Sequence, residues 1–86
     1  MMAQGNKKKI ATQRAVEQIA GPYLVENPIR DFIAEEDARR LSAELTAAFD
    51  NIYCGILPDG QGKKVFSACS SSTRRVFLRA EIMNNE

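Results

Sequence analysis

Histidine is absent from this chain of 86 residues, and with it the most common general base and the most common metal-binding side chain in proteins. Cysteine is scarce: Cys54 and Cys69 are the only two, and they could form a structural zinc site only with two further ligands. A nucleophilic cysteine would also lack the histidine that usually activates it. We therefore predict no enzymatic activity, no metal and no cofactor, and we expect both thiols to behave as small buried apolar groups.

Long apolar segments are absent as well. No stretch approaches the ~20 apolar residues that cross a bilayer, and no apolar run of signal-peptide length follows the N-terminus. Position 2 is not the glycine that N-myristoylation requires. Two cysteines are also too few for the disulfide scaffold of a small secreted domain. We therefore expect a cytoplasmic protein that does not contact a membrane.

The chain has no large excess of positive or negative charge either. Its 12 Lys and Arg residues nearly balance its 11 Asp and Glu residues, so the formal net charge is +1. A protein that coats nucleic acid is usually far more basic. The charges are nevertheless sorted along the chain, with acidic residues in the middle and basic residues at the start and in the C-terminal third. These basic residues are Lys7, Lys8, Lys9, Lys63, Lys64, Arg74, Arg75 and Arg79. The net charge argues against nucleic-acid binding, whereas its distribution leaves room for local basic surfaces.

The length of the chain corresponds to one domain. Residues 1–8 are polar and aperiodic and predict a disordered basic arm, residues 9–83 predict the domain itself, and residues 84–86 predict a frayed tail. We expect an α+β fold in which two or three N-terminal helices precede a C-terminal antiparallel β-hairpin or three-stranded meander. A domain this small buries a modest share of its surface, which favours a partner or a second copy.

Two helices are expected in the N-terminal part. Apolar side chains at helical spacing predict a helix over residues 9–20, which Gly21-Pro22 would end with the glycine in the left-handed conformation. Asn27-Pro28 predicts the N-cap and first turn of a second, short helix that carries Ile29, Phe32 and Ile33 on its apolar side.

The most regular apolar stripe predicts a long helix that begins near Glu35, since carboxylates suit the positive end of a helix dipole. Its apolar positions recur every three or four residues, at Ala38, Leu41, Leu45, Ala48, Phe49 and Ile52. Its end is open to two interpretations. The helix reaches Ile52 or Tyr53 with Gly55 as its cap, or it stops at Asp50-Asn51 and residues 52–57 form a strand. The strand is slightly favoured, because an isolated two-stranded hairpin is only marginally stable.

Turn-forming residues and alternation predict the C-terminal strands. Residues 58–62 and 71–73 are rich in turn formers, so strands are expected over residues 65–70 and 74–82. If residues 52–57 pair with residues 65–70, the two thiols could lie close enough for a disulfide. A reducing compartment disfavours that bond.

The final strand carries the best candidate binding surface. Strict alternation would place Phe77 on the face opposite the apolar residues 76, 78 and 80, with Arg75 and Arg79 on either side of it. An aromatic ring between two arginines can anchor a protein partner, and it can also stack a nucleic-acid base while the arginines bind phosphates. The competing structural explanation is that Phe77 pairs across the sheet with Phe66 and is covered by a helix or a second subunit.

The remaining sequence patterns are weaker indications of function than the final strand. The segment 60–64 lacks the spacing and the hydroxyl of a phosphate-binding loop and precedes a strand, so a hairpin turn is expected there. The consecutive acids Glu35, Glu36 and Asp37 fan around a helix and cannot converge on a metal. Helices followed by a hairpin is the element order of a winged helix, but an acidic start to the long helix would repel the DNA backbone.

Two functional hypotheses follow. The first is a small non-catalytic protein-binding regulator or inhibitor, of the kind that phages and other mobile elements often encode. It would bind an unidentified protein partner through Arg75, Phe77 and Arg79. The alternative is a small nucleic-acid-binding module that uses the arginines of the last strand together with Lys7, Lys8, Lys9, Lys63, Lys64 and Arg74. A homodimer is compatible with either hypothesis.

Overall fold

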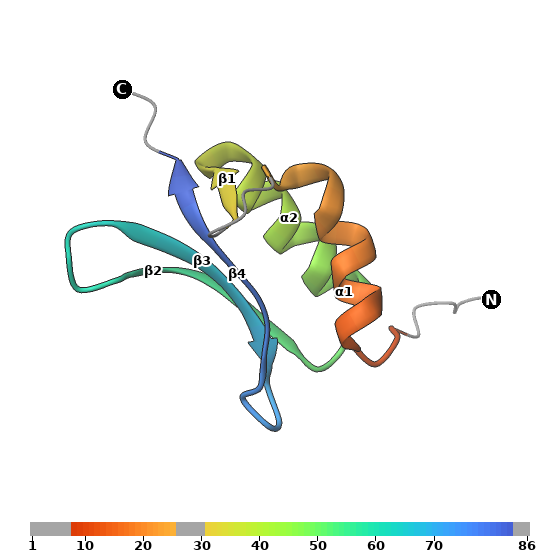
Figure 1. Cartoon of the computed structure of the whole chain (residues 1–86). Coiled ribbons are helices and arrows are strands. Elements are labelled where there is room, and N and C mark those ends of the chain that lie inside the picture. Colours follow the sequence, from red (N-terminus) through yellow and green to blue (C-terminus); the bar gives the residue numbers. More distant parts are fainter. Residues whose placement is uncertain (1–7, 26–30, 84–86) are drawn as a thin grey trace.

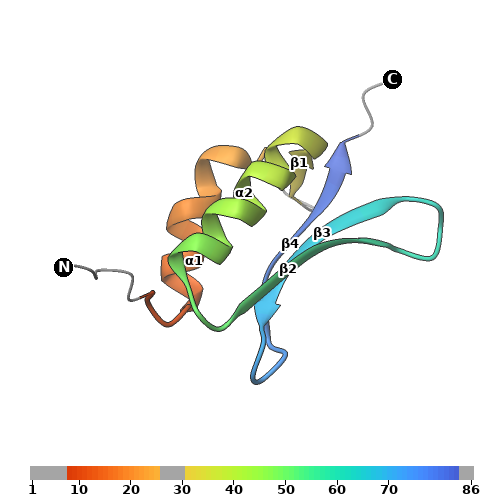
Figure 2. The same cartoon turned by 180° about the vertical axis from the view of Figure 1, so that it is seen from behind.

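Two α-helices cover one face of a four-stranded sheet in the computed structural model of this chain, which describes residues 8–25 and 31–83 (Figure 1, and Figure 2 from behind). The helices are α1 (Gln13–Ala20) and α2 (Glu35–Ala48), and a short 3-10 helix, η1 (Gly21–Tyr23), follows α1. The strands are β1 (Phe32–Ala34), β2 (Ile52–Pro58), β3 (Lys64–Ser70) and β4 (Val76–Met83). The predicted α+β class is therefore confirmed.

The sheet has the strand order β1-β4-β3-β2. Strands β2, β3 and β4 run antiparallel in chain order, and β1 pairs with β4 in the parallel direction. The expected hairpin or three-stranded meander is wrong in strand count and order, because one strand comes from the segment before α2. The short helix expected from Asn27 is wrong at Phe32 and Ile33, which lie in β1. The rest of that helix, residues 27–30, lies outside the described residues.

The backbone of β1 is extended because neighbours hold it on both sides. Phe32 N–H donates to the Val25 carbonyl at 3.2 Å, Val25 N–H donates to the Phe32 carbonyl at 2.8 Å, and on the other side Glu81 N–H donates to the Asp31 carbonyl at 3.0 Å. The Ile33 side chain is 0% exposed. These hydrogen bonds and this burial outweigh the weak helical spacing of the segment, as tertiary context often does.

The first helix begins at Gln13 rather than at Lys9, because Thr12 is its N-cap. The Thr12 hydroxyl accepts the Ala15 backbone N–H at 3.2 Å and so satisfies one of the free donors of the first turn. Lys9, which was expected inside the helix, instead forms a parallel bridge with Phe49 at the end of α2.

The same helix ends at Ala20, where Gly21-Pro22 predicted its end. Gly21 does not adopt the expected left-handed conformation: its φ is −48°, and the chain continues into the right-handed turn of η1. Pro22 fits this turn, because a proline near the start of a helix removes a donor that has no partner there.

The long helix α2 matches its apolar stripe. Ala38, Leu41 and Leu45 are each 0% exposed. The helix ends at Ala48 because Phe49 is extended, with φ −128°, while its N–H still donates to the Leu45 carbonyl. Of the two interpretations of this region, the strand is the correct one, and it begins at Ile52.

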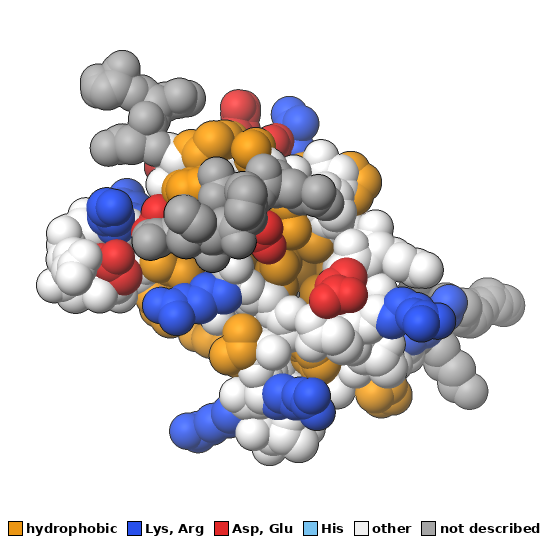
Figure 3. Space-filling model, viewed as in Figure 1, with side chains coloured by type: hydrophobic (Ala, Val, Ile, Leu, Met, Phe, Trp, Pro, Cys, Tyr) orange, Lys and Arg blue, Asp and Glu red, His pale blue; other side chains and the backbone are white. Residues whose placement is uncertain are grey.

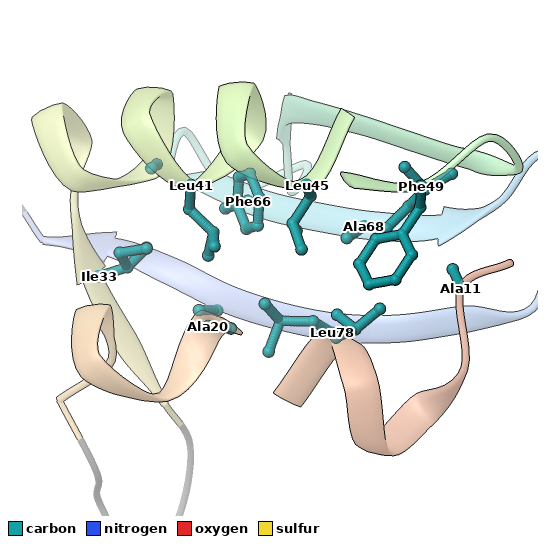
Figure 4. Close-up of a cluster of buried hydrophobic side chains, with 13 residues drawn as sticks. Ala11, Ala20, Ile33, Leu41, Leu45, Phe49, Phe66, Ala68 and Leu78 are labelled. Atoms are coloured by element: carbon teal, nitrogen blue, oxygen red, sulfur yellow. The ribbon is translucent and has the colours of Figure 1, made fainter. Parts of the chain in front are cut away.

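The core lies between the helices and the inner face of the sheet (Figure 4). Phe66 of the inner strand β3 is 0% exposed and projects toward α2, where Leu41 and Leu45 lie (Figure 4). Leu78 from β4 and Ile33 from β1 extend the same buried cluster. The helices therefore bury one face of the sheet and leave the other face for contacts outside the core.

Candidate interaction surface

The face of the sheet opposite the helices is called the open face below. Its residues follow from the register, because paired residues project to the same side and successive residues alternate. Phe66, Ala68, Ile52 and Ile56 belong to or pack against the core, so the residues between them project to the open face. The open face includes Tyr53, Gly55 and Leu57 of β2, Val65, Ser67 and Cys69 of β3, Val76, Arg79 and Glu81 of β4, and Phe32 of β1, which lies in register with Glu81.

Three apolar side chains on the open face are exposed, whereas Val65 between the rows is only 6% exposed. Tyr53 is 63% exposed, Leu57 52% and Val76 51%, and they are three of the five large hydrophobic residues exposed in the described part of the chain. Tyr53 lies in register with Cys69, which lies in register with Val76. The neighbouring row runs from Gly55 through Ser67 to Arg79. Tyr53 and Leu57 therefore lie on β2, two strands away from Val76 and Arg79 on β4, and β3 with Ser67 and Cys69 runs between them.

Phe77 does not stand on the open face. The register of β3 and β4 shifts between Ala68 and Cys69, so that Ala68 pairs with Leu78 while Cys69 pairs with Val76. Phe77 is the extra residue of this β-bulge, and a bulge interrupts strict alternation. Its side chain is half-buried and packs against the core cluster. The Phe77 carbonyl also accepts the Gln13 side-chain amide at 2.7 Å, which ties this point to α1.

The bulge also separates the two predicted arginines. Arg79 is exposed on the open face, in register with Ser67. Arg75 precedes β4, and its carbonyl accepts the Ser70 N–H at 2.8 Å to close the hairpin. The expected trio of Arg75, Phe77 and Arg79 is therefore not one contiguous surface. Only Arg79 belongs to the open face, which it shares with the exposed side chains of Val76 on the same strand and of Tyr53 and Leu57 on β2.

The basic residues proposed for nucleic acid are divided between two ends of the sheet. Lys63 and Lys64 lie at the β2–β3 turn, and Arg74 lies at the β3–β4 turn, with the length of β3, about 20 Å for seven residues, between them. Lys63 and Lys64 line a hollow of about 870 Å³ together with the carboxylates of Glu35, Glu36 and Glu81. Those carboxylates would repel a phosphate. In the view of Figure 3, basic side chains lie in separate groups rather than in one stripe.

Toward the other end of the sheet, the segment with Lys8 and Lys9 and the turn with Arg74 and Arg75 are both bonded to Asn51 through neighbouring residues. Asn51 connects the two segments, because its side-chain oxygen accepts the Ala11 N–H at 2.8 Å and its carbonyl accepts the Ser71 N–H at 2.9 Å. The Lys8 ammonium donates to the Thr46 carbonyl at 3.0 Å. Lys7 and the rest of the expected arm lie outside the described residues.

Arg74 is the one described residue other than glycine with a positive φ, which is 63°. The Arg74 N–H donates to the Ser70 carbonyl at 2.9 Å, and the Ser70 hydroxyl accepts the N–H groups of Ser72 and Thr73, so the turn holds this conformation. The left-handed region costs a residue with a Cβ roughly 1 kcal/mol that glycine does not lose.

Arg74→Gly is therefore expected to stabilise the fold by about 0.5–1 kcal/mol, which for a domain of this size raises Tm by a few degrees. Thermal unfolding followed by circular dichroism measures the effect. Arg75→Gly, at a position whose φ is not positive, is the matched control and should leave the fold unchanged or less stable. A lower Tm for Arg74→Gly than for the wild type would contradict this account of the turn.

The two cysteines are free thiols on opposite faces of the sheet. Cys54 pairs with Ala68 on the core side, whereas Cys69 pairs with Tyr53 on the open face. Strand β2 does pair with β3, as the disulfide hypothesis required. The two thiols nevertheless lie on opposite faces of the sheet, and they cannot be joined without moving the backbone. Both thiols are half-buried rather than buried. Burial raises the pKa of Cys54 to about 11, which keeps it protonated and unreactive near neutral pH.

The residues that the sequence analysis missed are Tyr53, Leu57 and Val76. Tyr53, Gly55 and Leu57 alternate with Ile52, Cys54 and Ile56, and that alternation indicates one exposed face once residues 52–58 are assigned to a strand. No such pattern marks Val76, because the bulge reverses its orientation relative to Leu78 and Ala80.

No helix among the described residues is long and apolar enough to cross a membrane. In the same residues, His, Cys, Asp and Glu side chains form no group that could hold a metal ion. The chain matches no protein-family model, and it has no match among curated proteins or solved structures.

Proposed function

We propose that this chain is a small non-catalytic protein-binding regulator that contacts a protein partner through the open face of its sheet. The observation that carries this proposal is the exposure of Tyr53, Leu57 and Val76, at 63%, 52% and 51%, on a face that the helices leave uncovered. The contact residues of protein interfaces are enriched in Tyr and Arg and depleted in Lys and Glu. Tyr53 and Arg79 supply both enriched types on neighbouring rows of this face.

The support beneath the open face favours tight binding. Phe66 and Ala68 of β3 are 0% exposed, and they fix the strand that carries Ser67 and Cys69 between them. A side chain held on a sheet loses less conformational entropy on binding than one on a loop, so less of the interaction energy is spent on ordering the surface. Arg79 can form several hydrogen bonds from one planar group, and no described carboxylate lies within ion-pair distance of it.

Nucleic-acid binding is the alternative, and one observation favours it. The segments that carry Lys8 and Lys9 and Arg74 and Arg75 are both bonded to Asn51, so these residues lie toward the same end of the sheet although they are far apart in the sequence. Two observations weigh against it: the net charge is +1, and Lys63 and Lys64 share a hollow with three glutamates. Single strands are usually held by stacking on several aromatic side chains, and Tyr53 is the one exposed aromatic residue in the described part of the chain.

Capture of the partner from a lysate of the native host, with and without nuclease, followed by titration calorimetry with the purified partner, tests the proposal. Tyr53→Ala and Arg79→Ala should each weaken binding by about 30-fold or more, which corresponds to about 2 kcal/mol. Two control variants change side chains that are also exposed but lie away from the open face. Ile10→Ala removes a side chain that is 65% exposed, and Arg14→Ala removes an exposed arginine on α1. Both controls should bind like the wild type.

The salt dependence separates the two functions. Binding to a protein through the open face should weaken only moderately as salt rises. For nucleic acid, log K should fall with log salt at a slope of roughly −0.7 to −0.9 per phosphate neutralised. Equal binding by Tyr53→Ala, Arg79→Ala and both controls would overturn the open-face proposal. Submicromolar, steeply salt-dependent binding to DNA or RNA that Arg74→Ala weakens would favour the alternative.

A further inference from the structure

The two edges of the sheet differ. At one edge, β1 has three residues, and Val25 bridges to its outer side through Phe32. At the other edge, β2 has seven residues and pairs along its whole length with β3 on one side. No described segment pairs with its outer side. A strand edge without a partner presents a row of backbone N–H and C=O groups that can pair with another chain.

The hydrogen bonds at both ends of β2 show which of these groups point outward. Asp59 N–H donates to the Lys63 carbonyl at 2.9 Å, and Ser71 N–H donates to the Asn51 carbonyl at 2.9 Å. Residues 51 and 59 therefore point their backbone groups toward β3, and in an antiparallel pair the direction alternates with each residue. Tyr53, Gly55 and Leu57 bond inward. The N–H and C=O groups of Ile52, Cys54 and Ile56 point away from the sheet.

The usual protections of an edge strand are missing from β2. Natural edges carry charged residues, prolines or bulges that prevent pairing. The strand Ile52–Pro58 contains no charged residue, and its register with β3 is continuous over all seven pairs. Pro58 is the last residue of the strand.

We propose that β2 pairs in the antiparallel direction with β2 of a second copy of this chain, with the two-fold axis at Gly55. In this register Cys54 and Ile56 of one copy exchange backbone hydrogen bonds with Ile56 and Cys54 of the other. Ile52 N–H of one copy donates to the Pro58 carbonyl of the other. Pro58 has no N–H to donate in return, but this lost hydrogen bond costs little because the pair lies at the end of the ladder. All seven residues of each strand are then paired.

The side chains of β2 are complementary to themselves in this register. On the open face, Tyr53 of each copy meets Leu57 of the other, and these are the two most exposed apolar side chains of the strand, at 63% and 52%. Aromatic–aliphatic pairs across strands are favourable. Gly55 lies at the axis, where the two backbones approach most closely and the absence of a side chain leaves room. Because the strand is uncharged, self-pairing brings no like charges together.

A hollow beside the outer edge of β2 also supports pairing with a second copy. It measures about 260 Å³ and lies between α2 and β2, lined by Ala38, Arg39, Ser42, Gly55, Ile56 and Phe66. In the proposed pairing, Cys54 of the second copy lies opposite Ile56 on the core side of the sheet, next to this hollow. The side chain of the second copy would therefore cover apolar surface that one copy alone leaves open.

The pairing closes at two copies, because the β1 edge is short and bridged by Val25. It also joins the two four-stranded sheets with all helices on one side and both open faces on the other. Tyr53 and Leu57 belong to both the open face and this pairing, but the pairing rests on the backbone edge of β2 and holds whether or not the open face binds a partner.

Sedimentation velocity of the whole chain between about 1 µM and 1 mM tests the pairing, with a concentration-dependent shift from one copy to two as the expected result. Gly55→Lys should raise the dimer Kd about 100-fold or more, because it sets two like charges face to face at the axis. Nothing lies within 4 Å of a Cβ at Gly55, so the fold should tolerate the change. Gly55→Ala should keep the dimer. Ser67→Lys adds the same charge to the same row of the open face but on β3, and it should also keep the dimer.

Amide hydrogen exchange at the two concentrations gives a residue-specific readout. The N–H groups of Cys54 and Ile56 should exchange much more slowly at 1 mM than at 1 µM. Those of Tyr53 and Leu57, already bonded to β3, should change far less and serve as the internal control. A single copy at 1 mM, an assembly that grows beyond two copies, or a dimer that Gly55→Lys leaves intact would each overturn the proposal. If Ser67→Lys loses partner binding but still forms the dimer, the partner binds the open face and the dimer forms through the β2 edge.

Discussion

Phe66→Ala is expected to lower the free energy of unfolding by about 3–5 kcal/mol. The ring is 0% exposed, and it lies on β3, which has a paired strand on each side. Ile56 and Ala80 are its cross-strand neighbours, and neither is large enough to fill the cavity that alanine would leave. Because a domain of this size has a total stability of about 5–15 kcal/mol, the variant should be largely or partly unfolded at 37 °C.

Urea unfolding followed by circular dichroism measures this effect. Tyr53→Ala is the matched control, because it removes an aromatic ring from the neighbouring strand at a site that is 63% exposed. The control should change stability by less than about 1 kcal/mol. A Phe66→Ala variant as stable as the control would mean that the sheet does not pack against the helices through β3.

Leu45→Ala should cost about 2–5 kcal/mol, and Leu41→Ala a similar amount, since both side chains are 0% exposed on the core side of α2. One kcal/mol corresponds to about 4–8 °C in Tm for a domain of this length, so a fall of about 8 °C or more is expected. Arg40→Ala removes an exposed side chain from the same helix and should change Tm by a degree or two. If Leu45→Ala has the same Tm as Arg40→Ala, the apolar stripe of α2 is not its buried face.

The elements that the sequence predicts best are those with a long, regular pattern. The stripe through Leu41 and Leu45 spans the whole of α2, and the turn residues on both sides of β3 leave a strand as the simplest interpretation between them. In each case local preference and tertiary packing agree, which makes the pattern informative.

The strand β1 could not be predicted in this way. It has three residues, too few for a period to be recognised, and its conformation depends on hydrogen bonds with Val25 and Glu81, which lie outside this short segment of the sequence. The start of α1 was missed for a simpler reason. Thr12 is a good N-cap, but the apolar residues before it also fit a helical face, and the stripe alone does not mark the boundary.

The position of two of the proposed residues can be compared with the alternation that predicted them. Arg79 is exposed on the open face as alternation predicts, whereas Phe77 packs against the core because of the bulge beside it. A bulge adds one residue to a strand and reverses the orientation of everything before it, and no residue type in this segment marks its place. That Tyr53 and Val76 lie in one row of the open face becomes visible only when the three strands are aligned in register.

We propose that the open face binds a protein. Chemical-shift mapping of the ¹⁵N-labelled chain during titration with the purified partner tests it most directly, because every backbone amide outside the prolines reports on its own surroundings. The account predicts the largest changes at Tyr53, Ser67 and Arg79, with small changes along the exposed side of α2 and at Lys8 and Arg74. Changes that centre on α2, or on Lys8 and Arg74, while the open-face amides stay in place would contradict it.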